Sequence, residues 1–265
     1  MSYLNTKPLL YGIRKSAIIN DIELTEDYPS KIAQMLIDDE VDIALIPVAA
    51  TFYMSEWYIV GTHCIGCEGA VASVGIFSEV PMEKIEVVYL DYQSKTSVNL
   101  AQILLREYWK KDVVFIDATG EDYRKKITGT TAAVIIGDRA LEQRLVSKYI
   151  YDLGEAWLKY MGLPFVFAAW ISNKKLPNDF VTAFDEANEV GLQHLEAVIA
   201  ENHFAAYDLR KYFTSCISYV LNEEKMKGMD LFLKKLKEKH YFHGQKLNYE
   251  NNCCFINRFG FWCWL

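Results

Sequence analysis

The sequence has no long apolar run, and we expect no secretory leader. No stretch approaches the ~20 consecutive apolar residues that a membrane helix needs. The first ten residues contain Asn5, Lys7 and Pro8, which interrupt any apolar core of a secretory signal. We therefore expect a cytoplasmic protein that does not associate with a membrane.

Positive charge is also scarce. The chain has 28 Lys and Arg residues against 35 Asp and Glu residues, a formal net charge of −7 and a pI of about 5.3. An acidic chain without a basic stripe is a poor partner for nucleic acid or for an anionic membrane surface. A small anionic substrate stays possible, because local hydrogen-bond donors can outweigh the net charge.

Cysteine is sparse, with six residues in 265: Cys64, Cys67, Cys216, Cys253, Cys254 and Cys263. They do not form the framework of a secreted disulfide-rich protein. Cys64 and Cys67 make one C-x-x-C pair, but a zinc site needs about four ligands and no second pair has a suitable spacing. A strand follows this pair, whereas a thioredoxin-type motif opens a helix. We expect no metal and no cofactor.

Apolar residues are abundant, at 51% of the chain, and are grouped in short runs. The runs at 42–50, 70–77, 84–91, 112–117, 132–138 and 163–172 are typical of buried strands. Helical patterns separate several of them, for example 97–109 and the helix that begins near Pro29. This alternation predicts an α/β protein with parallel sheets, followed by helices over the last third, with a break near Gly228.

Two series of strands and helices predict two α/β lobes. We expect the first lobe to comprise residues 1–77 and 171–265, with a helical C-terminal part, and the second lobe to comprise residues 78–170. Two strands would cross at the hinge, so that the polar loops of the lobes face each other across a ligand cleft.

The polar loops carry a resemblance to a known family. In order along the chain they are "SYLNTKPL" (2–9), "DIALIPVAA" (42–50), "GAVASVGIFS" (69–78), "SKTSV" (94–98), "IIGDRAL" (135–141) and "YDLGEAWLKYMGLPFVFAAW" (151–170). Together these stretches resemble the chorismate dehydratase family of the futalosine route to menaquinone. The resemblance implies a fold like that of type II periplasmic binding proteins. It also implies a lyase that removes water from chorismate to give 3-[(1-carboxyvinyl)oxy]benzoate.

Asn5 and Ser73 are our candidates for the reacting centre. An amide both donates and accepts hydrogen bonds, and a hydroxyl can do either, so these groups suit a leaving hydroxyl or a proton in transit. From the residues alone, Asn5 is better explained as the cap of a helix starting near Lys7–Pro8, and Ser73 as a small buried residue. The resemblance favours the catalytic role. We expect Asp138 to cap or orient a loop.

Substrate binding is assigned to polar residues near helix starts. Ser94, Thr96 and Ser97 precede an apolar helix, where free backbone N–H groups and hydroxyls can bind a carboxylate. An ordinary N-cap would use the same residue types. Ser30 carries the same two interpretations, and Thr6 and Gly69 complete the predicted set.

No motif supplies an obvious general base. His63 is the nearest candidate, and a carboxylate of chorismate itself is the alternative, since desolvation raises carboxylate basicity.

Two other functions fit the same fold. One is a small-molecule binder without catalytic activity, and the other is the sister enzyme 1,4-dihydroxy-6-naphthoate synthase.

Overall fold

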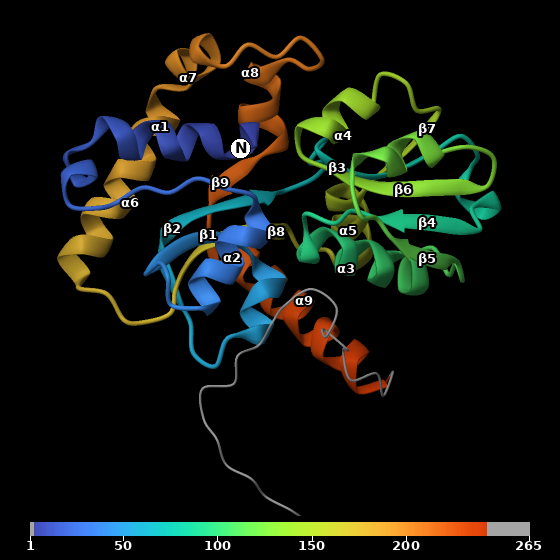
Figure 1. Ribbon diagram of the computed structural model, residues 1–265, viewed down its shortest axis with the longest axis horizontal. Coiled ribbons are helices and arrows are strands. Elements are labelled where there is room, and N and C mark those ends of the chain that lie inside the picture. Colours follow the sequence, from blue (N-terminus) through green and yellow to red (C-terminus); the bar gives the residue numbers. More distant parts are fainter. Residues whose placement is uncertain (1–2, 243–265) are drawn as a thin grey trace, which may run out of the picture.

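The computed structural model describes residues 3–242 as two lobes side by side, each built on its own β-sheet (Figure 1). The four-stranded sheet has the order β1 (Ile43–Pro47), β8 (Phe165–Ser172), β2 (Tyr58–Cys67) and β9 (Ser218–Val220). The five-stranded sheet has the order β5 (Val114–Asp117), β4 (Val87–Leu90), β6 (Thr131–Ile136), β3 (Val74–Ser78) and β7 (Tyr149–Asp152). The predicted α/β fold with two sheets is confirmed.

The prediction of parallel sheets is wrong for most strand pairs. Only β4 runs parallel to its neighbours, β5 and β6. Strand β8 lies antiparallel between β1 and β2, and β9 is antiparallel to β2. In the other sheet, β3 is antiparallel to both β6 and β7. Strand β8 enters its sheet after the excursion through the other lobe. The alternation of strands and helices does not reveal the direction in which such a returning strand runs.

The chain crosses between the sheets twice. It leaves the four-stranded sheet after Cys67, enters the other sheet at Val74, and returns between Asp152 and Phe165. The lobe boundaries predicted from the sequence, at 77/78 and 170/171, lie at or near the C-terminal ends of β3 and β8. Each therefore falls about one strand later than the crossing from sheet to sheet.

Helices cover both sheets. The four-stranded lobe carries α1 (Lys7–Lys15), α2 (Pro29–Ile37), α6 (Asn178–Gln193), α7 (Leu195–Glu201), α8 (Leu209–Lys211) and α9 (Glu223–Phe242), and the five-stranded lobe carries α3 (Lys95–Ile103), α4 (Asp138–Gln143) and α5 (Leu153–Met161). Helix α2 begins at Pro29, as predicted. Among the described helices, none is long and apolar enough to cross a membrane.

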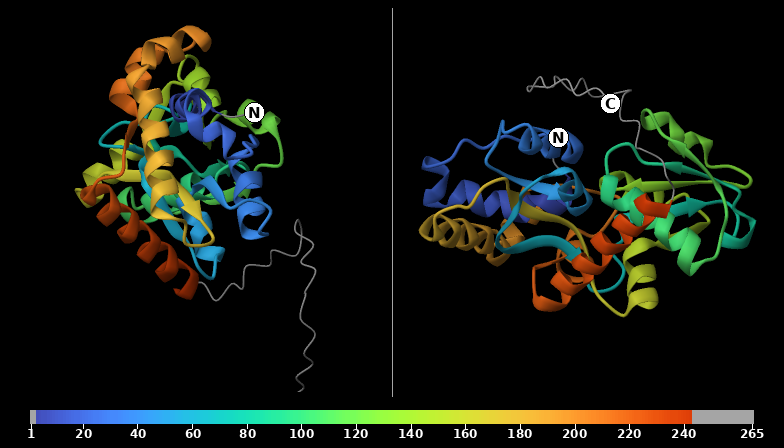
Figure 2. Two further views of the ribbon diagram at one scale, coloured as in Figure 1. Left: turned by 90° about the vertical axis from the view of Figure 1, so that its left-hand side faces the viewer. Right: turned by 90° about the horizontal axis from the view of Figure 1, so that it is seen from below.

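Helix α1 is held unusually close to α6, and the two lie side by side in Figure 2. A Cβ atom added to Gly12 would lie 2.0 Å from the Ala187 carbonyl oxygen, and one added to Gly191 would lie 1.7 Å from the Pro8 carbonyl oxygen. Only glycine permits this approach. The contact fixes the first turns of α1, which directly follow the segment that contains Asn5.

The helices predicted over the last third of the chain are divided differently from our expectation. A π-helical segment, Tyr212–Cys216, follows α8, and then Ser218–Val220 pairs with β2. Helix α9 runs through Gly228 without a break. The strand exists because β2 offers it a partner, so the local pattern does not reveal it. Lys225 of α9 is fully buried and donates to Glu68, to the Ser218 hydroxyl and to the Val220 carbonyl, which fastens α9 to this edge.

Candidate functional site

Asn5 lies in a short 3-10 turn, Leu4–Thr6, that leads directly into α1. The turn is held at both ends. The Leu4 N–H donates to Asp138 Oδ1 at 3.0 Å, and the Tyr219 hydroxyl donates to the Asn5 carbonyl at 3.0 Å. The partly exposed side chain of Asn5 makes no hydrogen bond to any residue that the structure describes. It does not cap α1, whose N-cap is Thr6.

Ser73 follows a strained turn at the first crossing between the sheets. Ala72 has a φ of +63°, a region that residues with a side chain rarely occupy. The Ser73 N–H donates to the Val71 carbonyl at 2.7 Å, as in a γ-turn. The Asp152 carboxylate accepts from the Val71 and Ala72 N–H groups at 3.0 and 2.8 Å, and Arg144 donates to the Ala72 carbonyl at 3.1 Å. These contacts stabilise the turn that presents Ser73.

Gly137 and Asp138 bring these two segments together. The Gly137 N–H donates to the Ser73 carbonyl at 2.7 Å, while Asp138 accepts from Leu4. Gly137 has a φ of +63°, and a Cβ atom there would lie 2.4 Å from the Tyr3 ring. Burial raises the pKa of Asp138 to about 6, although the Leu4 N–H opposes that shift. The predicted orienting role of Asp138 is confirmed, and its partner is the turn that carries Asn5.

The three residues predicted at the start of α3 are buried. Ser94 is the N-cap: its hydroxyl accepts from the Ser97 N–H at 3.1 Å and donates to the Ser97 hydroxyl at 3.0 Å. Thr96 Oγ1 accepts from the Ala49 N–H at 3.0 Å. Ala49 lies in the 3-10 segment after β1, so this bond joins the two lobes. The capping alternative therefore holds for Ser94, and Thr96 instead reaches across to the other lobe.

The other three predicted binding residues are more scattered. The Thr6 hydroxyl donates to the Tyr3 carbonyl at 2.8 Å, next to Asn5. Gly69 lies in the same crossing as Ser73, with open space where a side chain would project. Ser30 lies in the first turn of α2 and is partly exposed. Thr6 and Gly69 are thus on the segments that carry Asn5 and Ser73, whereas Ser30 is on a separate helix.

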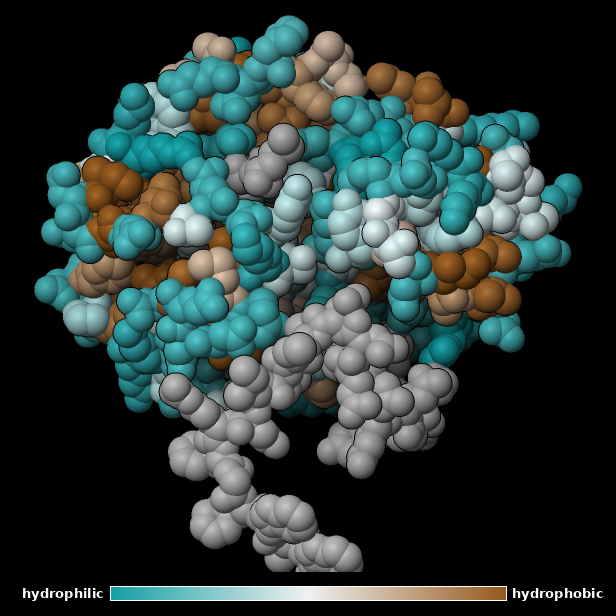
Figure 3. Space-filling view, in the orientation of Figure 1, coloured by the Kyte–Doolittle hydropathy of each residue, from teal (hydrophilic) through white to brown (hydrophobic). Residues whose placement is uncertain are grey.

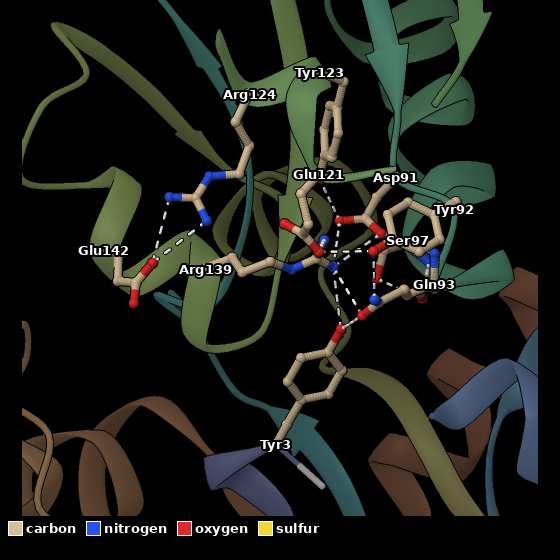
Figure 4. Close-up of polar contacts among 11 residues, drawn as sticks. Tyr3, Asp91, Tyr92, Gln93, Ser97, Glu121, Tyr123, Arg124, Arg139 and Glu142 are labelled. Carbon is tan, nitrogen blue, oxygen red and sulfur yellow. Dashed lines mark hydrogen bonds and ion pairs between the residues drawn. The ribbon is translucent and has the colours of Figure 1, made fainter. Parts of the chain in front are cut away.

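A polar network that the sequence did not indicate joins Tyr3 to the five-stranded lobe (Figure 4). Arg139 Nη2 donates to Asp91 at 2.9 Å, to Gln93 at 3.0 Å and to the Tyr3 hydroxyl at 3.1 Å, and this hydroxyl donates to Gln93. Burial acts to lower the pKa of Arg139, but Asp91, together with Tyr3, Tyr123 and Glu121, outweighs it and the pKa is raised. Arg139 therefore stays charged. "IIGDRAL" was part of the family resemblance, but nothing in the sequence pairs Arg139 with Tyr3.

His63 does not lie among these groups. It is buried between β2 and α6, with Nδ1 2.6 Å from Asp185 Oδ1 and Nε2 3.2 Å from Glu189 Oε2. Both ring nitrogens are thereby engaged by carboxylates. The geometry does not support His63 as a general base for Asn5 and Ser73.

A cavity of about 690 Å³ lies within the four-stranded lobe, between α1, α2, β1, α6 and the segment 21–27. Tyr3 and Thr6 line it, but Asn5 and Ser73 do not. Its wall combines apolar side chains with acidic ones, such as Asp21 and Glu23, and includes no Lys or Arg. The same lobe, at the left of Figure 3, shows hydrophobic residues between hydrophilic ones. Because the cavity wall has acidic side chains and no Lys or Arg, it disfavours a substrate with two carboxylates.

The two thiols of the C-x-x-C pair are unreactive. Cys64 and Cys67 are buried, and burial raises the pKa of Cys64 to about 12 and that of Cys67 further. Thiols of this kind are not reactive at neutral pH. Among the side chains that the structure describes, residues 3–238, no three His, Cys, Asp or Glu gather as a metal site would require. Cys253, Cys254 and Cys263 lie outside the described residues.

Solved structures share this two-lobed arrangement. A protein from Archaeoglobus fulgidus superposes with a TM-score of 0.65 at 12% identity, covering 91% of this chain and 95% of that one. The periplasmic aliphatic sulphonate binding protein of Escherichia coli gives a TM-score of 0.58 at 11% identity, covering 90% of this chain and 83% of that one. At such identities the likeness shows the fold alone, which is that of periplasmic binding proteins.

Sequence comparison is more specific. The chorismate dehydratase of Thermus thermophilus is 25% identical over 224 residues, which is 74% of this chain and 77% of that protein. The family described as menaquinone biosynthesis matches residues 1–238, and so includes every residue assigned to the site. The chain belongs to this menaquinone biosynthesis family.

Proposed function

We propose that this protein is a chorismate dehydratase, a hydro-lyase that forms 3-[(1-carboxyvinyl)oxy]benzoate for menaquinone by the futalosine route. The observation that carries the proposal is the meeting of the Asn5 and Ser73 segments at Gly137 and Asp138. The similarity to the Thermus thermophilus enzyme supports the choice of substrate.

The reaction needs little from the protein beyond positioned donors and acceptors. The ring proton at C3 is lost and the C4 hydroxyl departs. Negative charge that develops at C3 spreads through the adjacent double bond into the ring carboxylate, and aromatisation drives the product downhill. Donors fixed toward developing charge lower the barrier because they need no reorganisation during the reaction.

Asn5 and Ser73 are assigned to the reacting centre. The Asn5 amide has no partner among the described residues, and the Ser73 hydroxyl is buried and likewise unpartnered there. Each retains its hydrogen-bonding capacity for a ligand. We assign them to the leaving C4 hydroxyl and to the proton that is transferred.

The start of α3 is assigned to a substrate carboxylate. Thr96 and the Ala49 N–H satisfy each other in this structure. A carboxylate that inserts between them would accept from both and replace one neutral bond by two charge-assisted bonds. The backbone N–H groups at the start of α3 add to the attraction.

The proton acceptor is assigned to the enolpyruvyl carboxylate of chorismate. His63 is engaged elsewhere, and Asp138 already accepts a hydrogen bond from Leu4. A carboxylate in a water-poor cleft is a stronger base than in solution.

The test is incubation of purified protein with chorismate, followed by separation of the products. We expect an aromatic product that retains the enolpyruvyl ether, formed far faster than in a heat-denatured control. Tight binding with unchanged chorismate would identify a binding protein instead. Turnover of the cyclic futalosine compound, without turnover of chorismate, would identify the sister synthase.

A further inference from the structure

Two buried hydroxyls have no hydrogen-bond partner within the described part of the chain, and they lie close enough for one to act on the pKa of the other. They are Ser73 Oγ, on a residue that is 1% exposed, and the phenol of Tyr212, on a residue that is fully buried. A buried polar group without a partner lowers stability by about 1–3 kcal/mol. Two such groups in one place indicate a requirement other than stability.

The two hydroxyls come from separate, irregular segments. Ser73 follows the strained turn at Ala72, and Tyr212 opens the π-helical segment Tyr212–Cys216. Left-handed residues and π-helical segments both occur often at functional sites. The Ser73 turn is fixed by Asp152 and Arg144, so the strain is maintained by contacts rather than relaxed.

The protonation state of the phenol is set by its surroundings. Burial raises the pKa of Tyr212, the adjacent Ser73 hydroxyl opposes that shift, and the nearby Asp138 carboxylate adds to it. Tyr212 is therefore a neutral phenol at neutral pH. A neutral phenol next to a serine hydroxyl can donate its proton to the serine oxygen.

We propose that Tyr212 is a positioning residue for Ser73: in the substrate complex it donates a hydrogen bond to Ser73 Oγ, so that the serine proton points at the departing C4 hydroxyl. This inference rests on the proposed function. No bond of the protein forms or breaks: the phenol occupies one lone pair of the serine oxygen and thereby orients its single proton. Cooperative polarisation along the pair makes the serine a better donor.

The test is Tyr212→Phe, which removes only the hydroxyl. We expect kcat to fall about tenfold or more, but by no more than the 10²–10³ that a direct donor contributes. KM should change little. The melting temperature should stay level or rise, because an unpartnered group has been removed. Tyr160→Phe is the matched control, since the Tyr160 hydroxyl donates to Glu107 at 3.0 Å away from this pair, and its kcat should not change.

The Ser73→Ala background makes the test specific. If Tyr212 acts through Ser73, Tyr212→Phe should have no further effect on kcat when Ser73 is already alanine. An acidic fluorotyrosine placed at 212 should shift the alkaline limb of the kcat profile to lower pH, and it preserves folding if the phenylalanine variant does not fold. Two results would overturn the role of Tyr212 without affecting the proposed function. The first is an active wild type whose kcat is unchanged by Tyr212→Phe. The second is a loss of kcat from Tyr212→Phe that is equally large in the Ser73→Ala background. Wild type that leaves chorismate intact would overturn the proposed function, and this role with it.

Discussion

Thr96 Oγ1 lies 3.0 Å from the backbone nitrogen of Ala49, so a side chain of the five-stranded lobe satisfies a backbone group of the four-stranded lobe. The Thr96 side chain is fully buried. The bond lies at the N-terminus of α3, where free N–H groups favour an anion. The same pair therefore serves as a contact between the lobes and as a candidate subsite for a carboxylate.

Replacing Thr96 by valine should affect both roles. The Ala49 N–H loses its buried partner, so we expect the free energy of unfolding to fall by about 1–3 kcal/mol. Affinity for chorismate should fall by the equivalent of a charge-assisted hydrogen bond, about 1.5–3 kcal/mol. Thr96→Ser keeps the hydroxyl and is the control. Denaturant unfolding and calorimetric binding measure the two effects, and a valine variant with unchanged affinity would place the carboxylate elsewhere.

The Arg139–Asp91 pair should be far more important for stability than its exposed counterpart. Both side chains are largely buried, at 12% and 0% exposure, so Asp91→Asn leaves the guanidinium with only the exposed Glu121 as a counter-charge. We expect a loss of about 3–5 kcal/mol. Glu142→Gln is the matched control, because Glu142 pairs with Arg124 at the surface and should change stability by less than about 1 kcal/mol. Equal losses in urea denaturation would contradict this account.

Asp138 should make stability depend on pH in a defined direction. Its pKa is raised from 3.8 to about 6 by burial, so between these values the folded state holds a proton that the unfolded state has lost. The resulting stabilisation is complete below the unfolded pKa and is lost as pH rises through about 6. Asp138→Asn cannot titrate but still accepts from Leu4. The stability of wild type relative to this variant should therefore fall from about pH 4 to pH 6, by up to about 3 kcal/mol.

The same variant tests the identity of the base. If the enolpyruvyl carboxylate takes the C3 proton, Asp138→Asn keeps most of its turnover at neutral pH, because the Asn5 turn is still held. A loss of about 10³ or more in kcat on folded protein would instead make Asp138 the base.

The sequence predicted the class of fold and the loops that meet, because buried strands and polar loops leave local patterns. The direction of β8, the strand β9 and the exact sheet crossings depend on partners that are distant along the chain. At the site, Asn5 and Ser73 came from the family resemblance, whereas Tyr212 lies in a stretch that has only a helical pattern. Its hydroxyl gains a role only where the fold places it beside Ser73.

Asn5→Ala and Ser73→Ala should each lower kcat by about 10²–10³ while KM changes little. The reason is that the leaving hydroxyl and the proton in transit gain charge only in the transition state, so affinity for the substrate hardly registers the loss. Neither side chain contributes a hydrogen bond to the described structure, so the melting temperature should change little. Thr214→Ala is a suitable control, because its exposed hydroxyl contacts only the Arg210 carbonyl and the exposed Ser215 hydroxyl among the described residues. Single-turnover rates on protein verified as folded, set beside thermal melts, give the answer. Variants that melt early yet turn over normally would show that these two residues support the fold rather than the reaction.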